Sequence, residues 1–142
     1  MTKGDLYEFI AACSLGVIST RSASGSVQSA LVGIAVTHDL EIIFDTVKSS
    51  RKYSNLISHP ACSLVVGWTG EQTVQYEGVA TELQGAELQR CQATYFKTWP
   101  DGPSRMTWPG IVYFGVRPTW IRYSDFDANP PCILEFDLKQ PA

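Results

Sequence analysis

The sequence predicts a mainly β protein of the α+β class, built as a six- to seven-stranded antiparallel barrel of Greek-key or meander type with about three flanking helices. The apolar segments are short and follow one another through turn residues, which is typical of consecutive antiparallel strands. Only three segments carry apolar residues at helical spacing. The length of 142 residues, with 44% hydrophobic and 18% charged residues, fits a single folded domain over residues 1–142.

The first half of the chain begins with a helix and continues with strands. Helical spacing of apolar residues from Leu6 to Cys13 predicts a first helix near residues 3–13. Thr2 and Asp5 resemble a capping box at its start. Three strands joined by tight turns are then expected to form an antiparallel meander, at residues 15–20, 27–37 and 41–46. The second of these is apolar on nearly both faces, which predicts a central and well-covered strand.

The second half adds two helices and the remaining strands. A short helix is expected first, with Tyr53, Leu56 and Ile57 on its core face. Pro60 ends it. A longer helix is expected after Gln84-Gly85, with apolar residues from Leu88 to Trp99 along one side. The other expected elements are strands at 62–68, 73–83, 111–116 and 119–124, a loop at 100–110, a corner at Arg117-Pro118 and a short edge strand at 132–138.

The bulk properties exclude several functional classes. A net charge of −3 and a pI of about 5.3 do not suggest a nucleic-acid-binding protein, which usually has a strongly basic face. The sequence has no apolar run near the length that crosses a bilayer, and its N-terminus lacks a secretory pattern. Four cysteines without a C-x-x-C pair make a zinc site unexpected and favour buried free thiols in the reducing cytoplasm.

Residues 45–60 have the composition of an anion site. An apolar strand leads through hydroxyl and cationic residues into a helix whose first N–H groups and positive dipole end face outward. Ser49 or Ser50 can cap this helix. Arg51 and Lys52 then fall in its first turn, where cations oppose the dipole, and a bound phosphate would supply the missing counter-charge. The alternative is that the two cations belong to an ordinary solvated face.

The order of several fragments along the chain is similar to that of a known family. The fragments are Leu15-Gly16-Val17-Ile18-Ser19-Thr20, Gln28-Ser29-Ala30-Leu31-Val32, Phe44-Asp45-Thr46, Ser50-Arg51-Lys52-Tyr53-Ser54-Asn55-Leu56, His59-Pro60 and Gly78-Val79-Ala80. In this order and spacing they resemble the FMN-binding split β-barrel superfamily, in the branch related to pyridoxamine phosphate oxidase and general stress proteins. The resemblance covers nearly all of the chain and implies a split form of the predicted barrel.

The resemblance also implies a cofactor, an assembly and roles for the matched residues. Members of the family are typically homodimers with two FMN molecules at the subunit interface. Arg51 and Lys52 would hold the FMN phosphate, and Ser50 and Thr46 would add hydroxyl donors. Four residues of the second strand would lie along the isoalloxazine ring, unless they form an ordinary core strand: Ser29, Ala30, Leu31 and Val32.

Two further residues are candidates for the same site. Trp108 lies in a loop rich in proline and glycine, where it could wall a flavin or substrate pocket. Arg122 lies on a strand that borders the flavin site in the family, which makes it a candidate for a substrate or flavin contact. The alternative for Arg122 is a surface salt bridge with Asp125 or Glu135.

The expected function is that of a cytoplasmic, FMN-dependent oxidoreductase, with NADH or NADPH as a plausible electron donor. The chain lacks the R-x-x-L-L-K segment and the R-x-H tail of pyridoxamine phosphate oxidases, which argues against that particular reaction. No acid–base constellation stands out, and a flavoenzyme needs none, because the cofactor carries the redox chemistry. The alternatives are a deazaflavin-dependent reductase, or a flavin- or haem-binding sensor or stress protein without significant turnover. His38 and His59 are the available haem ligands.

Overall fold

The computed structural model describes residues 1–139; residues 140–142, which the predicted domain includes, lie outside the described residues. The elements in chain order are α1 (Lys3–Ala12), β1 (Leu15–Arg21), β2 (Val27–Gly33), β3 (Ala35–Val36), β4 (Ile42–Val47), α2 (Arg51–Ser58), β5 (Ala61–Val66), β6 (Gln72–Glu82), α3 (Gly85–Thr98), the 3₁₀ helix η1 (Gly102–Thr107), β7 (Ile111–Asp125) and β8 (Cys132–Asp137). The prediction of a mainly β chain with flanking helices is confirmed.

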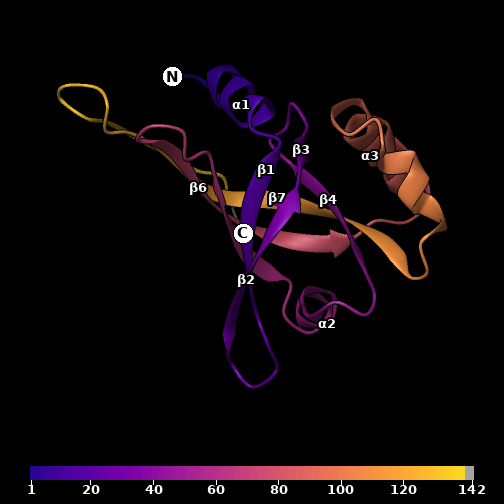
Figure 1. Ribbon diagram of the computed structural model, residues 1–142. Helices are drawn as coiled ribbons and strands as arrows, with labels where there is room; N and C mark the ends of the chain where they lie inside the picture. Colours follow the sequence, from indigo (N-terminus) through magenta and orange to yellow (C-terminus); the bar gives the residue numbers. More distant parts are fainter. Residues whose placement is uncertain (140–142) are drawn as a thin grey trace.

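All the strands belong to one antiparallel sheet that curls on itself. Its order is β2-β1-β5-β6-β7-β4-β3, with β8 paired to β7. The two ends of this order, β2 and β3, are separated in the chain only by Ile34, so the sheet must bend round to bring its ends together. Figure 1 shows α1 and α2 at opposite ends of the barrel and α3 alongside β4. The fold is therefore a split barrel, as the resemblance implied.

The barrel interior is filled from one face of each strand. Ala30, Ile18, Leu64 and Tyr76 lie in register across four neighbouring strands, and the last three are almost completely buried. The Tyr76 hydroxyl donates to Leu40 O at 2.7 Å and to Val116 O at 2.9 Å, so this polar group is hydrogen-bonded inside the core. Odd-numbered residues of β1, β2 and β5 consequently point to the outer face of the sheet.

The prediction for residues 27–37 is wrong in two respects. The segment breaks at Ile34, whose N–H donates to Ser14 O, and β3 then pairs with β4 at the other end of the sheet order. In addition, β2 pairs with β1 alone among the described strands, so it is an edge strand rather than a central one, and Leu31 is 61% exposed. Both hairpins of the predicted meander form in part: β1 pairs with β2, and β3, the last part of the expected second strand, pairs with β4. β4 also pairs with β7.

The predicted corner at Arg117-Pro118 does not exist. β7 runs through it without interruption, and Pro118 faces Gly78 where a register shift interrupts the pairing with β6. A bulge is a position where a strand tolerates proline, because the missing N–H has no ladder partner there. A Cβ on Gly78 would lie only 2.5 Å from Arg117 O, so the close approach of the two backbones requires glycine.

The helices follow the sequence more closely than the strands. Thr2 and Asp5 form the predicted capping box of α1, with Asp5 N 3.2 Å from Thr2 Oγ1 and Thr2 N 2.7 Å from Asp5 Oδ2. The backbone N–H of Thr2 holds the pKa of Asp5 below its ordinary value. α3 begins at the predicted glycine, but the expected loop at 100–110 contains η1. None of the helices in residues 1–139 is long and apolar enough to cross a membrane.

Candidate functional site

The start of α2 is organised by two hydroxyl groups. Ser50, rather than Ser49, is the N-cap: its extended backbone lets Oγ accept the N–H of Tyr53 at 3.2 Å. Thr46, at the end of β4 and 8% exposed, places its Oγ1 3.0 Å from Ser50 Oγ. The structure therefore brings Thr46 and Ser50 into direct contact at the positive end of the helix dipole.

The first turn of α2 faces a small cavity between the helix and the strands β1 and β2. The cavity has a volume of about 130 Å³, and we call it the α2 cavity. Its lining residues are Ile18, Thr20, Gln28, Ser29, Ala30, Arg51 and Lys52. Burial lowers the pKa of Lys52, and the nearby Asp45 carboxylate partly offsets this effect. Two adjacent cations beside a half-buried cavity form a suitable site for an anionic group.

A buried amide fixes the position of α2 on the barrel. Asn55 is 5% exposed, and its Nδ2 donates to Thr20 Oγ1 at 3.0 Å and to Gln28 Oε1 at 2.8 Å. These bonds join α2 to both strands that line the α2 cavity. Neither Thr20 nor Gln28 was predicted to support the site. The available signal was the polar Gln28 within an otherwise apolar strand.

The four predicted flavin-facing residues of β2 do not share one face. Strand alternation places Ser29 and Leu31 outward, whereas Ala30 and Val32 point toward the barrel interior, where Val32 belongs to the core. Ser29 and Ala30 line the α2 cavity, and Ser29 Oγ lies 2.9 Å from Ser19 Oγ of β1. Side chains of Leu31 and Val32 are absent from the lining of this cavity.

Trp108 and Arg122 lie elsewhere. Trp108 follows η1, is 51% exposed and does not line the α2 cavity. Arg122 is on β7, four positions from β2 in the sheet order, and its Nε lies 3.2 Å from Glu135 Oε1 on β8. A salt bridge with Glu135 is the alternative that was predicted for Arg122. The Arg122 Nε is buried, and its contact with Glu135 does not have hydrogen-bond geometry.

An ion pair that the sequence did not indicate connects η1 to β4. Arg105 Nε lies 3.1 Å from Asp45 Oδ2, and its Nη1 lies 2.8 Å from Asp101 Oδ2. The Arg105 and Asp45 side chains are each only 16% exposed. Since Asp45 precedes Thr46, this pair fixes η1 close to the end of β4 that leads into α2.

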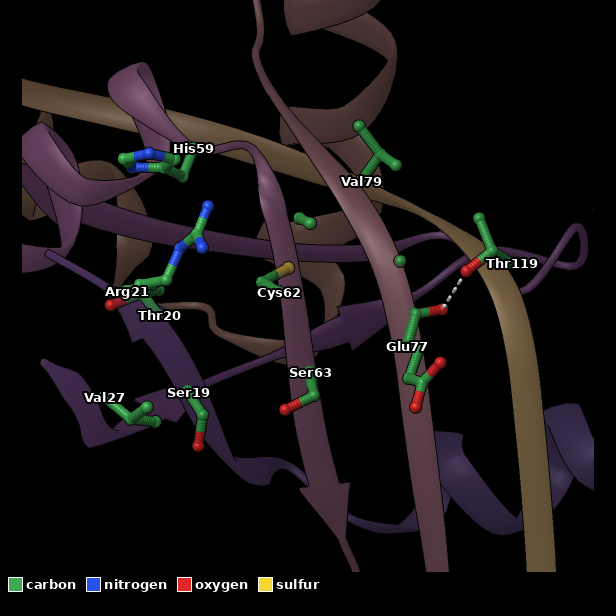
Figure 2. Close-up of a pocket in the computed structure, with 12 residues that line it drawn as sticks. Ser19, Thr20, Arg21, Val27, His59, Cys62, Ser63, Glu77, Val79 and Thr119 are labelled. Carbon is green, nitrogen blue, oxygen red and sulfur yellow. Dashed lines mark hydrogen bonds between the residues drawn. The ribbon is translucent and has the colours of Figure 1, made fainter. Parts of the chain in front are cut away.

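A second cavity opens on the outer face of the sheet. It has a volume of about 380 Å³, and we call it the outer-face cavity (Figure 2). It is lined by Ser19, Thr20, Arg21, Val27, His59, Ala61, Cys62, Ser63, Glu77, Gly78, Val79 and Thr119. Burial raises the pKa of Cys62 to about 12, so this thiol is uncharged near neutral pH. Arg21 and Glu77 are the charged residues in the lining of this cavity, and the imidazole of His59 also lines it.

The candidate haem ligands have different surroundings. The ring of His38 stacks on Tyr7 with a centroid distance of 4.1 Å. His59 ends α2, and its Nδ1 is buried without a hydrogen-bond partner in the described part of the chain. All four cysteines are free thiols, but the expectation that they are buried holds only for Cys62 and Cys91: Cys13 is partly buried and Cys132 is exposed. Within residues 1–139, no group of three or more His, Cys, Asp or Glu side chains could hold a metal ion.

The sequence profile of the pyridoxamine 5′-phosphate oxidase family matches residues 3–125. No curated protein matches the sequence. Among solved structures, the fold is similar to that of a haem-binding protein from Mycobacterium smegmatis, with a TM-score of 0.82 and 14% sequence identity. The matched region covers 96% of this chain but only 58% of the haem-binding protein's chain. The fold is also similar to that of general stress protein 26 from Bacillus anthracis, with a TM-score of 0.69 and 20% sequence identity. The matched region covers 94% of this chain and 98% of that chain.

A pyridoxamine 5′-phosphate oxidase-related, FMN-binding protein from Nostoc punctiforme also has this fold. Its TM-score is 0.71 and its identity 10%, over 95% of this chain and 86% of that chain. At such low identity these similarities concern the fold, and the cofactors differ between the neighbours.

Proposed function

Because the chain belongs to the pyridoxamine 5′-phosphate oxidase family, we propose that it is an FMN-binding flavoprotein that acts as a small oxidoreductase. The observation that carries the proposal is the α2 cavity, where Arg51 and Lys52 meet a helix N-terminus and the edge strand β2. Neither cation has a carboxylate within ion-pair distance among the described residues. A phosphate monoester fits this arrangement because it supplies the negative charge that both cations lack.

The residues in and near the α2 cavity would contact different parts of FMN. Arg51 and Lys52 would bind the phosphate through charge-assisted hydrogen bonds. Thr46 and Ser50 share one hydroxyl–hydroxyl contact, so one of their two protons remains available to a phosphate oxygen. Ser29 and Ala30, which line the cavity, would lie nearest to the rest of the cofactor. Bound FMN supplies the redox chemistry, while the chain binds and orients it and excludes water.

The proposal includes a homodimer with flavin at its interface. The outer face of the sheet exposes Val27 (76%), Leu31 (61%) and Val65 (42%), which is apolar surface that a second copy of the chain would cover. Leu31, Trp108 and Arg122 are proposed to contact flavin or substrate in this assembly rather than within one protomer. Val32, whose side chain is in the core, would contact the flavin only through its backbone. The expected donor is NADH or NADPH, in the cytoplasm, without a nucleic-acid or membrane partner.

The absorbance spectrum of the purified protein, with mass spectrometry of what denaturation releases, tests the cofactor. The visible absorbance bands of an oxidised flavin are expected. A deazaflavin spectrum would instead identify deazaflavin as the cofactor, and a Soret band would identify haem. Steady oxidation of NADH or NADPH with an added electron acceptor distinguishes an enzyme from a sensor or stress protein.

A double variant tests the phosphate assignment. Arg51→Gln with Lys52→Gln should weaken FMN binding by about a hundredfold, on the basis of two charge-assisted contacts. Arg117→Gln is the matched control, because this arginine also lacks a carboxylate partner in residues 1–139 but lines a different cavity. Full FMN affinity in the double variant would overturn the assignment of the α2 cavity.

A further inference from the structure

The charges around the start of α2 are not paired with one another. Within residues 45–60, Asp45 is the only acidic residue, whereas Lys48, Arg51 and Lys52 are basic. An ion pair between Asp45 and one of these neighbours would need no long-range contact. None of the three cations has a carboxylate within ion-pair distance among the described residues, so the segment keeps its positive charges free.

The carboxylate of Asp45 is bound instead by Arg105 of η1, which lies 60 residues away in the chain. Arg105 Nε lies 3.1 Å from Asp45 Oδ2, and each side chain is only 16% exposed. Asp101 holds the other side of the guanidinium, with its Oδ2 at 2.8 Å from Arg105 Nη1. Because the contact with Asp45 is largely shielded from water, the charge of that carboxylate is compensated more strongly than it would be at the surface.

Other contacts already attach α3 and η1 to the barrel. Trp99 Nε1 donates to Ile34 O at 3.0 Å, and Tyr95 lies in the apolar cluster beneath α3. Gly102, at the start of η1, packs so closely on Phe96 that a Cβ there would lie 2.5 Å from the ring. A half-buried ion pair adds little net stability, since desolvation offsets the attraction. Attachment of η1 alone therefore does not account for the Arg105–Asp45 pair.

The charge of Asp45 acts directly on the proposed phosphate site. Asp45 precedes Thr46, whose hydroxyl contacts Ser50 at the start of α2. Burial lowers the pKa of Lys52, and the Asp45 charge partly offsets this effect, so the two groups interact electrostatically. A carboxylate without a partner at this position would repel a bound anion and would compete with it for the lysine.

We propose that Arg105 is a positioning residue of the phosphate site and acts through Asp45. It neutralises the only carboxylate of residues 45–60, which leaves Arg51 and Lys52 to the phosphate. Arg105 itself does not line the α2 cavity, so it makes no direct contact with a ligand there. This role rests on the proposed FMN function, because it requires that the α2 cavity binds a phosphate monoester.

Fluorescence titration of the flavin-free full chain with FMN and with riboflavin tests the role of Arg105. Riboflavin has the same ring and ribityl chain but no phosphate, so only FMN should respond to the charge of Asp45. Arg105→Gln should weaken FMN binding about tenfold, because the uncompensated carboxylate opposes the phosphate, and should leave riboflavin binding unchanged. An equal loss of affinity for both ligands would mean that the ion pair only supports the fold, and would overturn the proposal.

Removal of the carboxylate should restore binding. Arg105→Gln combined with Asp45→Asn lacks the ion pair but also lacks the repelling charge, so its FMN affinity should return to within about twofold of the wild-type value. Asp45→Asn alone should bind FMN at least as tightly as the wild type. If the combined variant binds FMN as weakly as Arg105→Gln, the free charge of Asp45 is not the cause and the proposal is wrong.

Two further variants control for charge and for folding. Arg90→Gln removes an arginine that also pairs with two carboxylates, those of Glu41 and Glu87, and should leave FMN affinity unchanged. Arg105→Lys keeps the positive charge and should bind FMN more tightly than Arg105→Gln; equal weakness of the two variants would contradict a role for the charge. Circular dichroism verifies that each variant is folded.

The double variant Arg51→Gln with Lys52→Gln separates this role of Arg105 from the proposed function. If the double variant keeps full FMN affinity, the phosphate assignment is wrong and the role of Arg105 falls with it. If it loses FMN while Arg105→Gln binds FMN like the wild type, the phosphate site stands and only the role of Arg105 is refuted.

Discussion

The α2 cavity and the outer-face cavity share Thr20 of β1 in their walls but differ in charge and support. The α2 cavity holds two adjacent cations, which suits one anionic group. In the outer-face cavity, the cation Arg21 and the anion Glu77 stand apart across three strands. The spacing and sign of the charges therefore differ between the two cavities, and only the α2 cavity concentrates positive charge.

Their structural supports differ as well. The α2 cavity depends on a buried amide, Asn55, and on the capped start of a helix. The outer-face cavity lies on a sheet whose curvature there depends on Gly78 and the bulge beside Pro118. Substitutions at these supports should therefore affect the two cavities separately.

The largest effect is expected for Gly78→Ala. Its Cβ would lie 2.5 Å from Arg117 O and 2.7 Å from Val116 Cγ1, so β6 and β7 must separate. The free energy of unfolding, measured by urea denaturation, should fall by about 3 kcal/mol, as for other overpacked sites. Gly4→Ala is the control, because its Cβ would lie at an ordinary 3.5 Å from Thr2 Oγ1. Equal stability of the two variants would contradict a requirement for glycine where β6 and β7 approach each other.

Asn55→Ala should have the next largest effect, on the other cavity. It removes two hydrogen bonds and leaves Thr20 Oγ1 and Gln28 Oε1 without this donor, for a loss of about 2 kcal/mol in unfolding free energy. FMN affinity should fall, since α2 loses its attachment to β1 and β2. Ser54→Ala, on the exposed side of the same helix, serves as control. Unaltered FMN affinity in the Asn55 variant would show that the cavity does not need this support.

Ser50→Ala should cost about 1 kcal/mol of stability, because the N–H of Tyr53 loses its cap. Thermal denaturation compares it with Ser49→Ala, which removes the neighbouring hydroxyl that does not cap the helix. The Ser50 variant should also bind FMN more weakly, because Thr46 loses its hydroxyl partner. Equal melting temperatures for the two serine variants would contradict the assigned cap.

The smallest effect is a dependence of FMN affinity on pH. Burial lowers the pKa of Lys52 from 10.5, so this side chain loses its charge at a lower pH than an exposed lysine. The charged form binds phosphate, and affinity should therefore decrease as pH rises toward 10, before free lysine would titrate. Lys52→Arg retains its charge and should flatten the profile measured by fluorescence titration between pH 7 and 10. A wild-type profile as flat as that of the arginine variant would argue against a Lys52–phosphate contact.

Local signals predicted the parts of the fold that depend on neighbouring residues. The capping box at Thr2 and Asp5, the β1–β2 hairpin and the start of α3 at Gly85 follow from residues only a few positions apart. Errors arose where long-range pairing decides. β2 is apolar like a central strand but lies at the sheet edge, and Pro118 sits within a strand because Gly78 opposes it with a bulge.

The candidate site shows the same division. The order of hydroxyls and cations from Thr46 to Lys52 could be identified as an anion site, because all its members lie within one turn-and-helix segment. The Asn55 bonds to Thr20 and Gln28 span 35 and 27 residues, and Arg105 reaches Asp45 across 60 residues, so no local pattern could indicate them.

The capping box of α1, the alternation of strand faces and the family follow from residue types and their order, so the amino-acid sequence was enough to predict them. The choice of Ser50 over Ser49 as the cap of α2, and the pairing of the strands, depended on the fold. Strand pairing places Ser19, Ser63 and Glu77 in one row beside Arg21, and it places Arg122 next to Glu135 of β8. Hydrogen-bonded strand pairing joins residues far apart in the chain, and the closure of the barrel fixes all of these pairings together.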